Sequence, residues 1–170
     1  TLMSLAPKKC ESSVPTVVLL TPGHLNSAYY EHTFLSDQMG IEMVEAQDLF
    51  VENDFLYMKT VDGPKKIDVV YRRIDDDYLD PLAYNPNSVI GVPGITHVYK
   101  TGGLNICSAP GAGIADDKAV YIYVPEMIKF YLGETPILDN VQTWRCERDD
   151  DLKYVLENID ELVIKEVDGS

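Results

Sequence analysis

Short aliphatic runs recur along the first two-thirds of the chain, with longer segments of mixed polarity between them. The runs at residues 17–20, 41–46, 67–71 and 104–108 have the length and β-branched content of strands. Runs this apolar are typical of strands that are buried on both faces, as in a parallel sheet. Because helical segments separate them, we predict an α/β domain with a Rossmann-like parallel sheet and flanking helices.

The segment between the first two runs has the pattern of a helix. Asn26 and Ser27 suit its N-terminus, and Gly40 suits its end. Its larger apolar side chains fall roughly along one side of the helix: Tyr30, Phe34, Leu35 and Met39. This arrangement predicts an apolar helix face.

Three further features lie between the second and fourth runs. Residues 50–58 have the pattern of a hairpin that turns at Asn53 and Asp54. Residues 78–94 are rich in Pro, Asn and Gly and predict a long loop, a kind of segment that often carries function. Residues 92–101 are expected to form a short helix.

The pattern changes after residue 115, where we place a domain boundary. We expect a helix from about Lys118 and a second helix from Pro125 to Gly133, because proline is tolerated in a first helical turn. Residues 142–146 and 162–167 are predicted strands. Between them, the helix that Asp149 opens carries apolar residues at helical spacing: Leu152, Val155, Leu156 and Ile159.

Composition excludes several classes of function. The chain has 170 residues, 28 of them Asp or Glu and 14 Lys or Arg, and a formal net charge of −14. Such a chain repels phosphate backbones and anionic lipid surfaces, so we expect no nucleic-acid partner and no membrane partner. Most of this charge is interpreted as solvated surface. A phosphate site must therefore rely on a few well-placed cations.

The cysteines indicate the cellular compartment of the protein, and the chain ends indicate how much of the protein is present. Cys10, Cys107 and Cys146 are too widely spaced for a zinc site and too few for a disulfide scaffold, which predicts a cytoplasmic protein. Residues 1–15 lack the apolar core of a signal peptide and are expected to be a disordered lead-in. The chain has no initiator Met and stops shortly after an apolar run, so we expect an internal fragment of a longer protein.

The loop after the first strand is the first candidate site. Ligands of doubly wound sheets bind at the carboxyl ends of strands, where Asn26 stands. The alternative is a tight strand-to-helix turn that Ser27 caps. His24, Glu31 and His32 lie close in sequence, but histidines near a turn are more often hydrogen-bonded surface groups, and no metal site is assigned.

The second candidate follows the third predicted strand. Arg72 and Arg73 come directly before the acidic triplet 75–77, which begins with Asp75. Side chains alternate along a strand, so only one of the two arginines can point into a given cleft, where it could clamp a carboxylate or a phosphate. The alternative is a cluster of ion pairs that fixes the loop.

The third candidate is a pair of lysines. Asp117 and Lys118 open a helix, and Lys165 follows 47 residues later within an apolar run. A lysine in a buried strand is costly unless its charge is satisfied, and a polyphosphate would satisfy it. The alternative is a lysine on an edge strand whose amino group reaches water.

At this third candidate the sequence resembles the ATP-grasp superfamily. The match is closest to its circularly permuted members related to glutathionylspermidine synthase. The segments that carry it run from about residue 16 to the end: LLTPGHLNSAYYEHTFLSDQMG, DVVYRRIDDDYLDPL, GVPG, GIADDKAVYIYVPEMIKFYLGE and VIKEVDGS.

The resemblance implies a division of the chain and a set of roles. Residues 16–115 would form a pre-ATP-grasp domain that helps to bind the substrate, and residues 116–170 would begin the ATP-grasp domain. Lys118 and Lys165 would contact ATP phosphates, and Glu166 and Val167 would lie along the nucleotide cleft. Four residues of the pre-ATP-grasp domain would face the substrate or the transferred phosphate: Asn26, Arg72 as the catalytic group, Arg73 and Asp75. The magnesium ligands would precede this segment.

The resemblance implies an ATP-dependent carboxylate–amine ligase that works through an acyl phosphate, with ATP, magnesium and a small carboxylate, amine or peptide as its partners. Two other functions stay open at this point. One is a relative that has lost catalysis and only binds a peptide or polyamine. The other is an unrelated flavodoxin-like small-molecule binder, which requires Lys118 and Lys165 to lie far apart. The sequence leaves the oligomeric state open.

Overall fold

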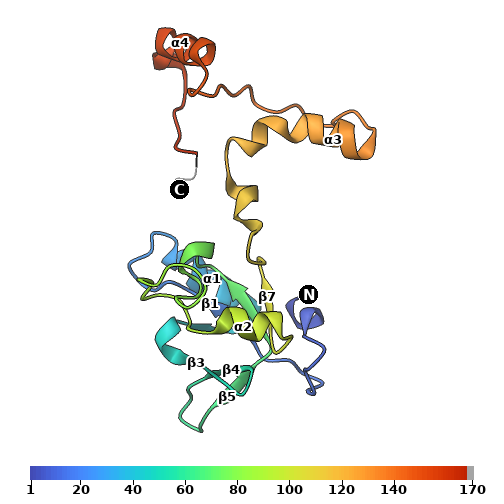
Figure 1. Ribbon diagram of the computed structural model, residues 1–170, viewed down its shortest axis with the longest axis vertical. Coiled ribbons are helices and arrows are strands. Elements are labelled where there is room, and N and C mark those ends of the chain that lie inside the picture. Colours follow the sequence, from blue (N-terminus) through green and yellow to red (C-terminus); the bar gives the residue numbers. More distant parts are fainter. Residues whose placement is uncertain (168–170) are drawn as a thin grey trace. The chain divides into compact units, whose positions relative to one another are not determined.

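The computed structural model describes residues 1–167 and divides the chain into two compact units, Thr1–Gly111 and Ala112–Ser170. Figure 1 draws their helices and strands and labels many of them. The division comes a few residues before the boundary that the sequence pattern suggests. Each unit is described by itself.

The first unit contains the predicted parallel sheet. All neighbouring strands in it run parallel, in the order β2-β1-β6-β7. Its strands are β1 (Val17–Leu20), β2 (Glu42–Val44), β6 (Val69–Arg72) and β7 (Asn105–Cys107). All four residues of β1 are buried, as expected for a strand that is covered on both faces. The mixed α/β class with a parallel sheet is confirmed.

A second, antiparallel sheet lies in the same unit. It has the order β3-β4-β5, with β3 (Leu49–Glu52), β4 (Phe55–Met58) and β5 (Lys65–Ile67). The predicted hairpin is confirmed, because Asn53 and Asp54 turn it with φ angles of 48° and 63°. The predicted strand over 67–71 is divided in two. Asp68 separates its halves, and its carboxylate accepts the Thr16 N–H at 2.9 Å.

One hydrophobic core fills the space between the two sheets and α2 (Ile95–Lys100). It takes alternate residues of β1, such as Val18 and Leu20, because successive side chains point to opposite faces. Leu56 from β4 and Ile67 from β5 are fully buried in it. The core therefore joins the two sheets into one unit.

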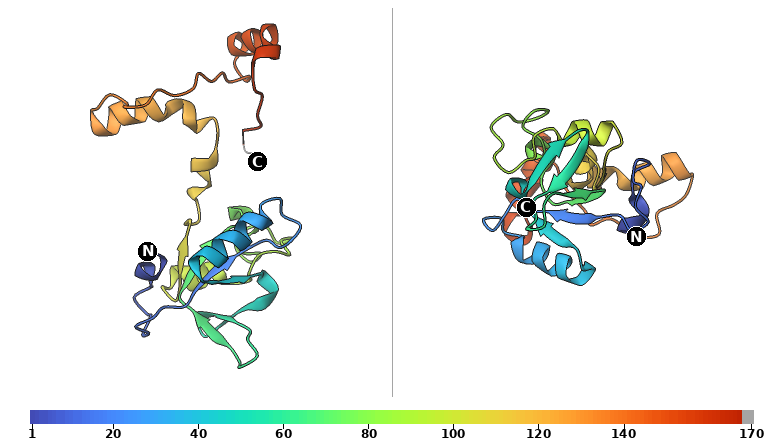
Figure 2. Two further views of the ribbon diagram at one scale, coloured as in Figure 1. Left: turned by 180° about the vertical axis from the view of Figure 1, so that it is seen from behind. Right: turned by 90° about the horizontal axis from the view of Figure 1, so that it is seen from below.

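Helix α1 (Tyr29–Met39) lies along the parallel sheet next to β2 (Figure 2). It ends at Gly40 as predicted, with a left-handed φ of 63°. The predicted apolar face is wrong, because Tyr30 is 82% exposed and Phe34 is 52% exposed. The buried side chains are His32 and Ser36, which are polar. The His32 ring is hydrogen-bonded to Thr21, which follows β1, and the Ser36 hydroxyl donates to the Ile41 carbonyl, just before β2. Polar contacts therefore hold α1 there.

The loop before α2 is fastened by a buried carboxylate. Asp80 Oδ1 accepts the N–H groups of Leu82 and Gly94 at 2.9 and 3.0 Å, and Oδ2 accepts that of Thr96 at 3.0 Å. A side chain at Gly91 would collide with the Tyr78 carbonyl oxygen, which lies 2.0 Å from the Cβ position. The long loop is thus closely packed.

The second unit is mostly helical. Its elements are η4 (Ala112–Asp116), η5 (Val120–Tyr123), α3 (Val124–Leu132), α4 (Asp149–Glu157) and η6 (Ile159–Glu161). Short 3₁₀ helices also occur in the first unit: η1 (Leu2–Leu5), η2 (Ala46–Asp48) and η3 (Asp76–Tyr78). The helix expected from about Lys118 starts as η5, and α3 carries proline in its first turn and ends before Gly133 as expected.

Both strands predicted for the second unit are wrong. Residues 142–146 and 162–167 are irregular, and the described part of this unit contains no strand. Val163 is 83% exposed and Ile164 62% exposed, so this apolar run pairs with no neighbouring strand among residues 112–167. A strand forms only where a partner completes its hydrogen bonds. Of the apolar residues on α4, only Val155 is buried.

Candidate functional site

The second unit holds a pocket of about 1070 Å³ that both predicted lysines line. Lys118 comes from the segment between η4 and η5, and Lys165 from the irregular segment that follows η6. The backbone joins these segments, because the Lys118 N–H donates to the Val167 carbonyl at 3.1 Å. Residues 47 positions apart in sequence are thereby held at one pocket.

Local structure explains how Lys118 is presented. Asp117 Oδ1 accepts the N–H of Ala119 at 2.7 Å, which stabilises the turn that precedes η5. Lys118 is half-buried there, between this turn and the backbone of Val167. Its main chain is fixed on both sides.

Lys165 lies in a different setting from the predicted one. It is exposed and is not part of a strand, so its charge is not a buried charge that a ligand must satisfy. The prediction that Lys165 is buried in an apolar strand is therefore wrong. Its position at the pocket is instead supported by the lining. Val167 shares that lining, whereas Glu166 is exposed and lies outside it.

The remaining pocket wall combines apolar surface with one more cation. Arg145 is hydrogen-bonded to the hydroxyl of Tyr123 and forms an ion pair with Glu147. Trp144 stacks on Tyr154, with ring centroids 4.8 Å apart. Three carboxylates, those of Asp117, Glu147 and Glu161, line the pocket as well. Mostly apolar walls with a few charged groups are typical of small-molecule sites.

The first unit presents its candidate residues at the carboxyl ends of the parallel strands. Strand β1 lies between β2 and β6, so the strand order changes direction at the β1–β6 boundary. Ligands of open α/β sheets bind at such switch points. The loop that carries Asn26 follows β1, and the segment that carries Arg73 and Asp75 follows β6.

Arg72 is occupied within the protein. Nε donates to the Ser108 carbonyl at 2.8 Å, Nη1 to that of Ile74 at 2.8 Å, and Nη2 to that of Ala109 at 3.2 Å. Nη1 also lies 2.8 Å from Asp76 Oδ1, and the arginine side chain is only 6% exposed. Nε and Nη2 thus hold the backbone where the chain leaves β7, and Nη1 holds it where the chain leaves β6.

Arg73 is the more accessible of the two arginines. Its guanidinium forms an ion pair with Glu31 on α1, and its side chain is 28% exposed. Nearby, His32 Nδ1 lies 2.9 Å from Thr21 Oγ1. Burial lowers the pKa of His32 below its ordinary 6.5, the Arg73 charge lowers it further, and the Glu31 carboxylate opposes both. His32 is therefore a neutral structural contact at neutral pH.

Asn26 and Asp75 are both exposed at this edge. Asn26 Oδ1 accepts the Ala28 N–H at 2.9 Å and so shapes the turn into α1. Asp75 precedes η3, and its carbonyl accepts the Tyr78 N–H at 3.2 Å. The Asn26 side chain is held by its own turn, but the turn is not capped as expected, because the N-cap of α1 is Ala28 rather than Ser27 and no side chain caps the helix.

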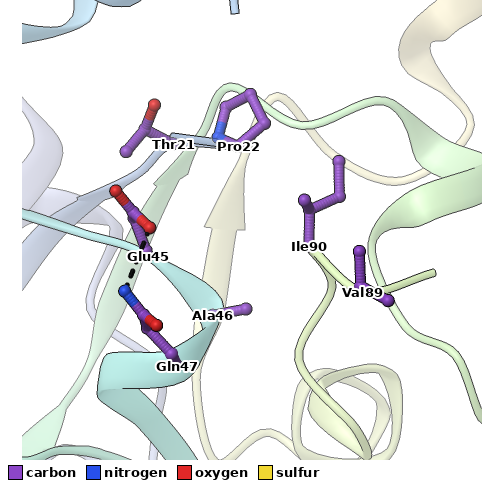
Figure 3. Close-up of a pocket in the computed structure, with 7 residues that line it drawn as sticks. All are labelled: Thr21, Pro22, Glu45, Ala46, Gln47, Val89 and Ile90. Atoms are coloured by element: carbon purple, nitrogen blue, oxygen red, sulfur yellow. Dashed lines mark hydrogen bonds between the residues drawn. The ribbon is translucent and has the colours of Figure 1, made fainter. Parts of the chain in front are cut away.

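A small cavity opens beside the β1 loop (Figure 3). Its lining includes the Glu45 carboxylate, which receives a hydrogen bond from Gln47 Nε2 at 3.2 Å. The sequence arguments missed Glu45, although it directly follows β2 and so stands at the same sheet edge as the other candidates. They also missed Trp144 and Arg145, because the segment around them was interpreted only as a strand.

Comparison with known proteins gives several similar chains. A protein of Synechocystis sp. with no assigned function is 52% identical over 165 residues, which are 97% of this chain and 34% of that protein. A functionally unassigned protein of Mycobacterium tuberculosis is 53% identical over 156 residues, 92% of this chain and 28% of its own length. A Frankia alni protein with the provisional name glutamate–cysteine ligase 2-3 is 42% identical over 155 residues, 91% of this chain and 18% of its own.

The chain thus spans about a third or less of the length of these relatives. A family model described as a circularly permuted ATP-grasp matches it over residues 1–170. The segments that resemble this family include both units, the β1 and β6 loops of the first and the two lysine segments of the second. The chain belongs to the circularly permuted ATP-grasp family.

Proposed function

We propose that this chain is part of an ATP-dependent carboxylate–amine ligase that works through an acyl phosphate. The observation that carries the proposal is the shared pocket of Lys118 and Lys165, held together by the hydrogen bond from the Lys118 N–H to the Val167 carbonyl. The same contact argues against a flavodoxin-like binder, for which the two lysines should lie apart.

In this proposal the lysines bind the phosphates of ATP. A carboxylate oxygen attacks the γ-phosphorus, ADP leaves, and an amine then displaces phosphate from the acyl phosphate to form an amide. Catalysis of phosphoryl transfer rests on positioning and charge neutralisation, and Lys118 and Lys165 would supply the positive charge. Val167 and Glu166 would lie along the nucleotide, with Val167 at the pocket wall.

The first unit is proposed to hold the second substrate at the carboxyl edge of its parallel sheet. Arg73, Asn26 and Asp75 are accessible there and keep their proposed contacts with substrate. For Arg72 we propose a positioning role, because its guanidinium nitrogens already donate to three backbone carbonyls. A substrate would have to displace these bonds in order to reach it.

Magnesium, when bound, supplies further neutralisation of phosphate charge. We assign no residue to it, since among residues 1–167 no three His, Cys, Asp or Glu side chains form a group that could hold a metal ion. Within the same residues no helix has the length and apolarity needed to cross a bilayer. We also propose a cytoplasmic location, which the three free cysteines support.

The sharpest test follows the fate of ATP in the full-length protein. L-Glutamate is a reasonable first acid, because the provisional name of the Frankia relative includes it. With Mg-ATP, glutamate or another acid from a panel, and hydroxylamine as the trapping amine, we expect ADP, phosphate and an acid-derived hydroxamate. Lys165→Ala should lower this turnover at least about tenfold.

Lys153→Ala is the matched control, since Lys153 is an exposed lysine of the same unit that lies outside the pocket lining. It should leave turnover unchanged. Release of AMP and pyrophosphate would contradict the acyl-phosphate route. Equal turnover in Lys165→Ala and Lys153→Ala would contradict the role given to Lys165.

A further inference from the structure

A separate cavity of about 80 Å³ lies in the first unit, at the carboxyl ends of β1 and β2. Figure 3 shows Glu45 and Gln47 on one side, Pro22 at the end of β1, and Ile90 from the long loop on the other side. Ala46 and Val89 complete the lining together with Thr21. The volume suits a group of a few heavy atoms rather than a whole cofactor.

The charge of the lining is one-sided. Glu45 is the only ionisable side chain among the seven lining residues, and no lysine, arginine or histidine lines the cavity. The Glu45 carboxylate is half-buried and receives the Gln47 amide and, through a capping box, the Asp48 N–H. A carboxylate has about four acceptor positions, so further acceptor positions remain for a donor inside the cavity.

The neighbouring glycine keeps this carboxylate uncovered. Gly23 has a φ of 101°, and a Cβ built on it would lie 3.3 Å from the carboxyl carbon and Oε1 of Glu45. The Gly23 N–H is held by Thr21 Oγ1 at 3.2 Å, so the turn is fixed in this form. Any side chain at position 23 would press on the carboxylate.

We propose that this cavity binds the ammonium end of a primary amine. Glu45 would pair with the charge, and Pro22 and Ile90 would contact the adjoining alkyl carbons. An anion is disfavoured, because it would face the carboxylate with no cation in the lining. The inference rests on the proposed ligase function, in which it assigns the amine substrate to the first unit.

The test uses the full-length protein with n-butylammonium as probe, at low ionic strength so that screening is weak. Calorimetry should detect binding, and amide signals of Gly23 and Ala46 should shift in NMR spectra of labelled protein. Glu45→Gln keeps an oxygen that can accept the Asp48 N–H but removes the charge, and should weaken binding about tenfold. Glu42→Gln removes an exposed charge from β2, the strand that Glu45 follows, and should change the affinity less than about twofold.

Equal affinities for Glu45→Gln and Glu42→Gln would overturn the proposal. So would binding of butyrate as strong as that of n-butylammonium, or probe-induced shifts that leave Gly23 and Ala46 unchanged. The failure of this inference is distinct from failure of the proposed function. Lys165→Ala should not change n-butylammonium affinity, and Glu45→Gln should not change affinity for ATP alone.

Discussion

The two units treat their apolar residues in opposite ways. In the first unit, strands from two sheets pack on one another, and side chains such as Leu20 and Leu56 are fully buried. In the described part of the second unit, Val155 is the only buried hydrophobic residue, and Phe130 is 80% exposed. The apolar pattern of the sequence is similar in both units, so the burial of an apolar side chain depends on whether a partner surface is present. Stability is therefore expected to reside in the first unit.

The greatest loss of stability is expected from a substitution in the core of the first unit. Leu56→Ala removes a fully buried side chain and should lower the free energy of unfolding by about 3 kcal/mol. Val163→Ala is the counterpart in the second unit, where the side chain is 83% exposed, and should change it by less than about 0.5 kcal/mol. Urea unfolding followed by far-UV circular dichroism measures both.

Trp144, the only tryptophan of the chain, reports on the second unit by fluorescence. In Leu56→Ala the circular dichroism transition should move to lower urea, whereas the Trp144 transition should stay in place. Coincident shifts in both signals would mean that the two units unfold as one, which would remove the contrast between them.

A smaller effect is expected from the two adjacent arginines. Arg72→Ala leaves one buried carbonyl, two partly buried carbonyls and Asp76 without their partner and should cost about 2 kcal/mol. Arg73→Ala removes one partly exposed ion pair with Glu31 and should cost less than about 1 kcal/mol. If urea unfolding gave the same loss of unfolding free energy for both variants, the contacts of Arg72 would stabilise the protein no more than the single ion pair of Arg73.

The smallest expected effect on stability comes from acid. The folded pKa of His32 is lowered, so below its ordinary 6.5 the unfolded chain binds more protons than the folded chain. The stability that neutral His32 contributes is complete above 6.5 and is lost as the pH falls through the folded pKa. Urea midpoints should therefore decline over this range, and His32→Asn should flatten the decline.

The pH effect is expected to arise in the first unit alone. The three histidines, His24, His32 and His97, all lie in the first unit. Acidification should therefore move the circular dichroism transition and leave the Trp144 transition unchanged in the same range. An unaltered pH dependence in His32→Asn would assign the effect to another group.

Much of the first unit could be predicted from its sequence, because its elements depend on local signals. The buried run of β1, the hairpin turn at Asn53 and Asp54, and the left-handed end of α1 at Gly40 all follow from residue type. The hydrophobic pattern did not predict which face of α1 is buried. His32 binds Thr21 through a hydrogen bond that a hydrophobic pattern cannot represent, and it draws the polar side of the helix toward the sheet.

Two strands are predicted for the second unit from the sequence, but its described residues form none. The run 162–167 has the composition of a strand, but pairing is a non-local property and no partner strand lies among residues 112–167. The two lysines that local motifs single out nevertheless line one pocket, and their role there stays a prediction. For Arg72, strand alternation indicated one inward arginine correctly, but only the structure shows that carbonyl oxygens already occupy it.

Lys118 and Lys165 are proposed to bind the phosphates of one ATP molecule in a shared pocket. The affinity of the full-length protein for ATP tests this most directly, measured by calorimetry in Lys118→Ala, Lys165→Ala and the control Lys153→Ala. We predict that each of the first two variants weakens binding at least about tenfold, with the control within about twofold of the unmodified protein. Unchanged affinity in either Lys118→Ala or Lys165→Ala would contradict the claim.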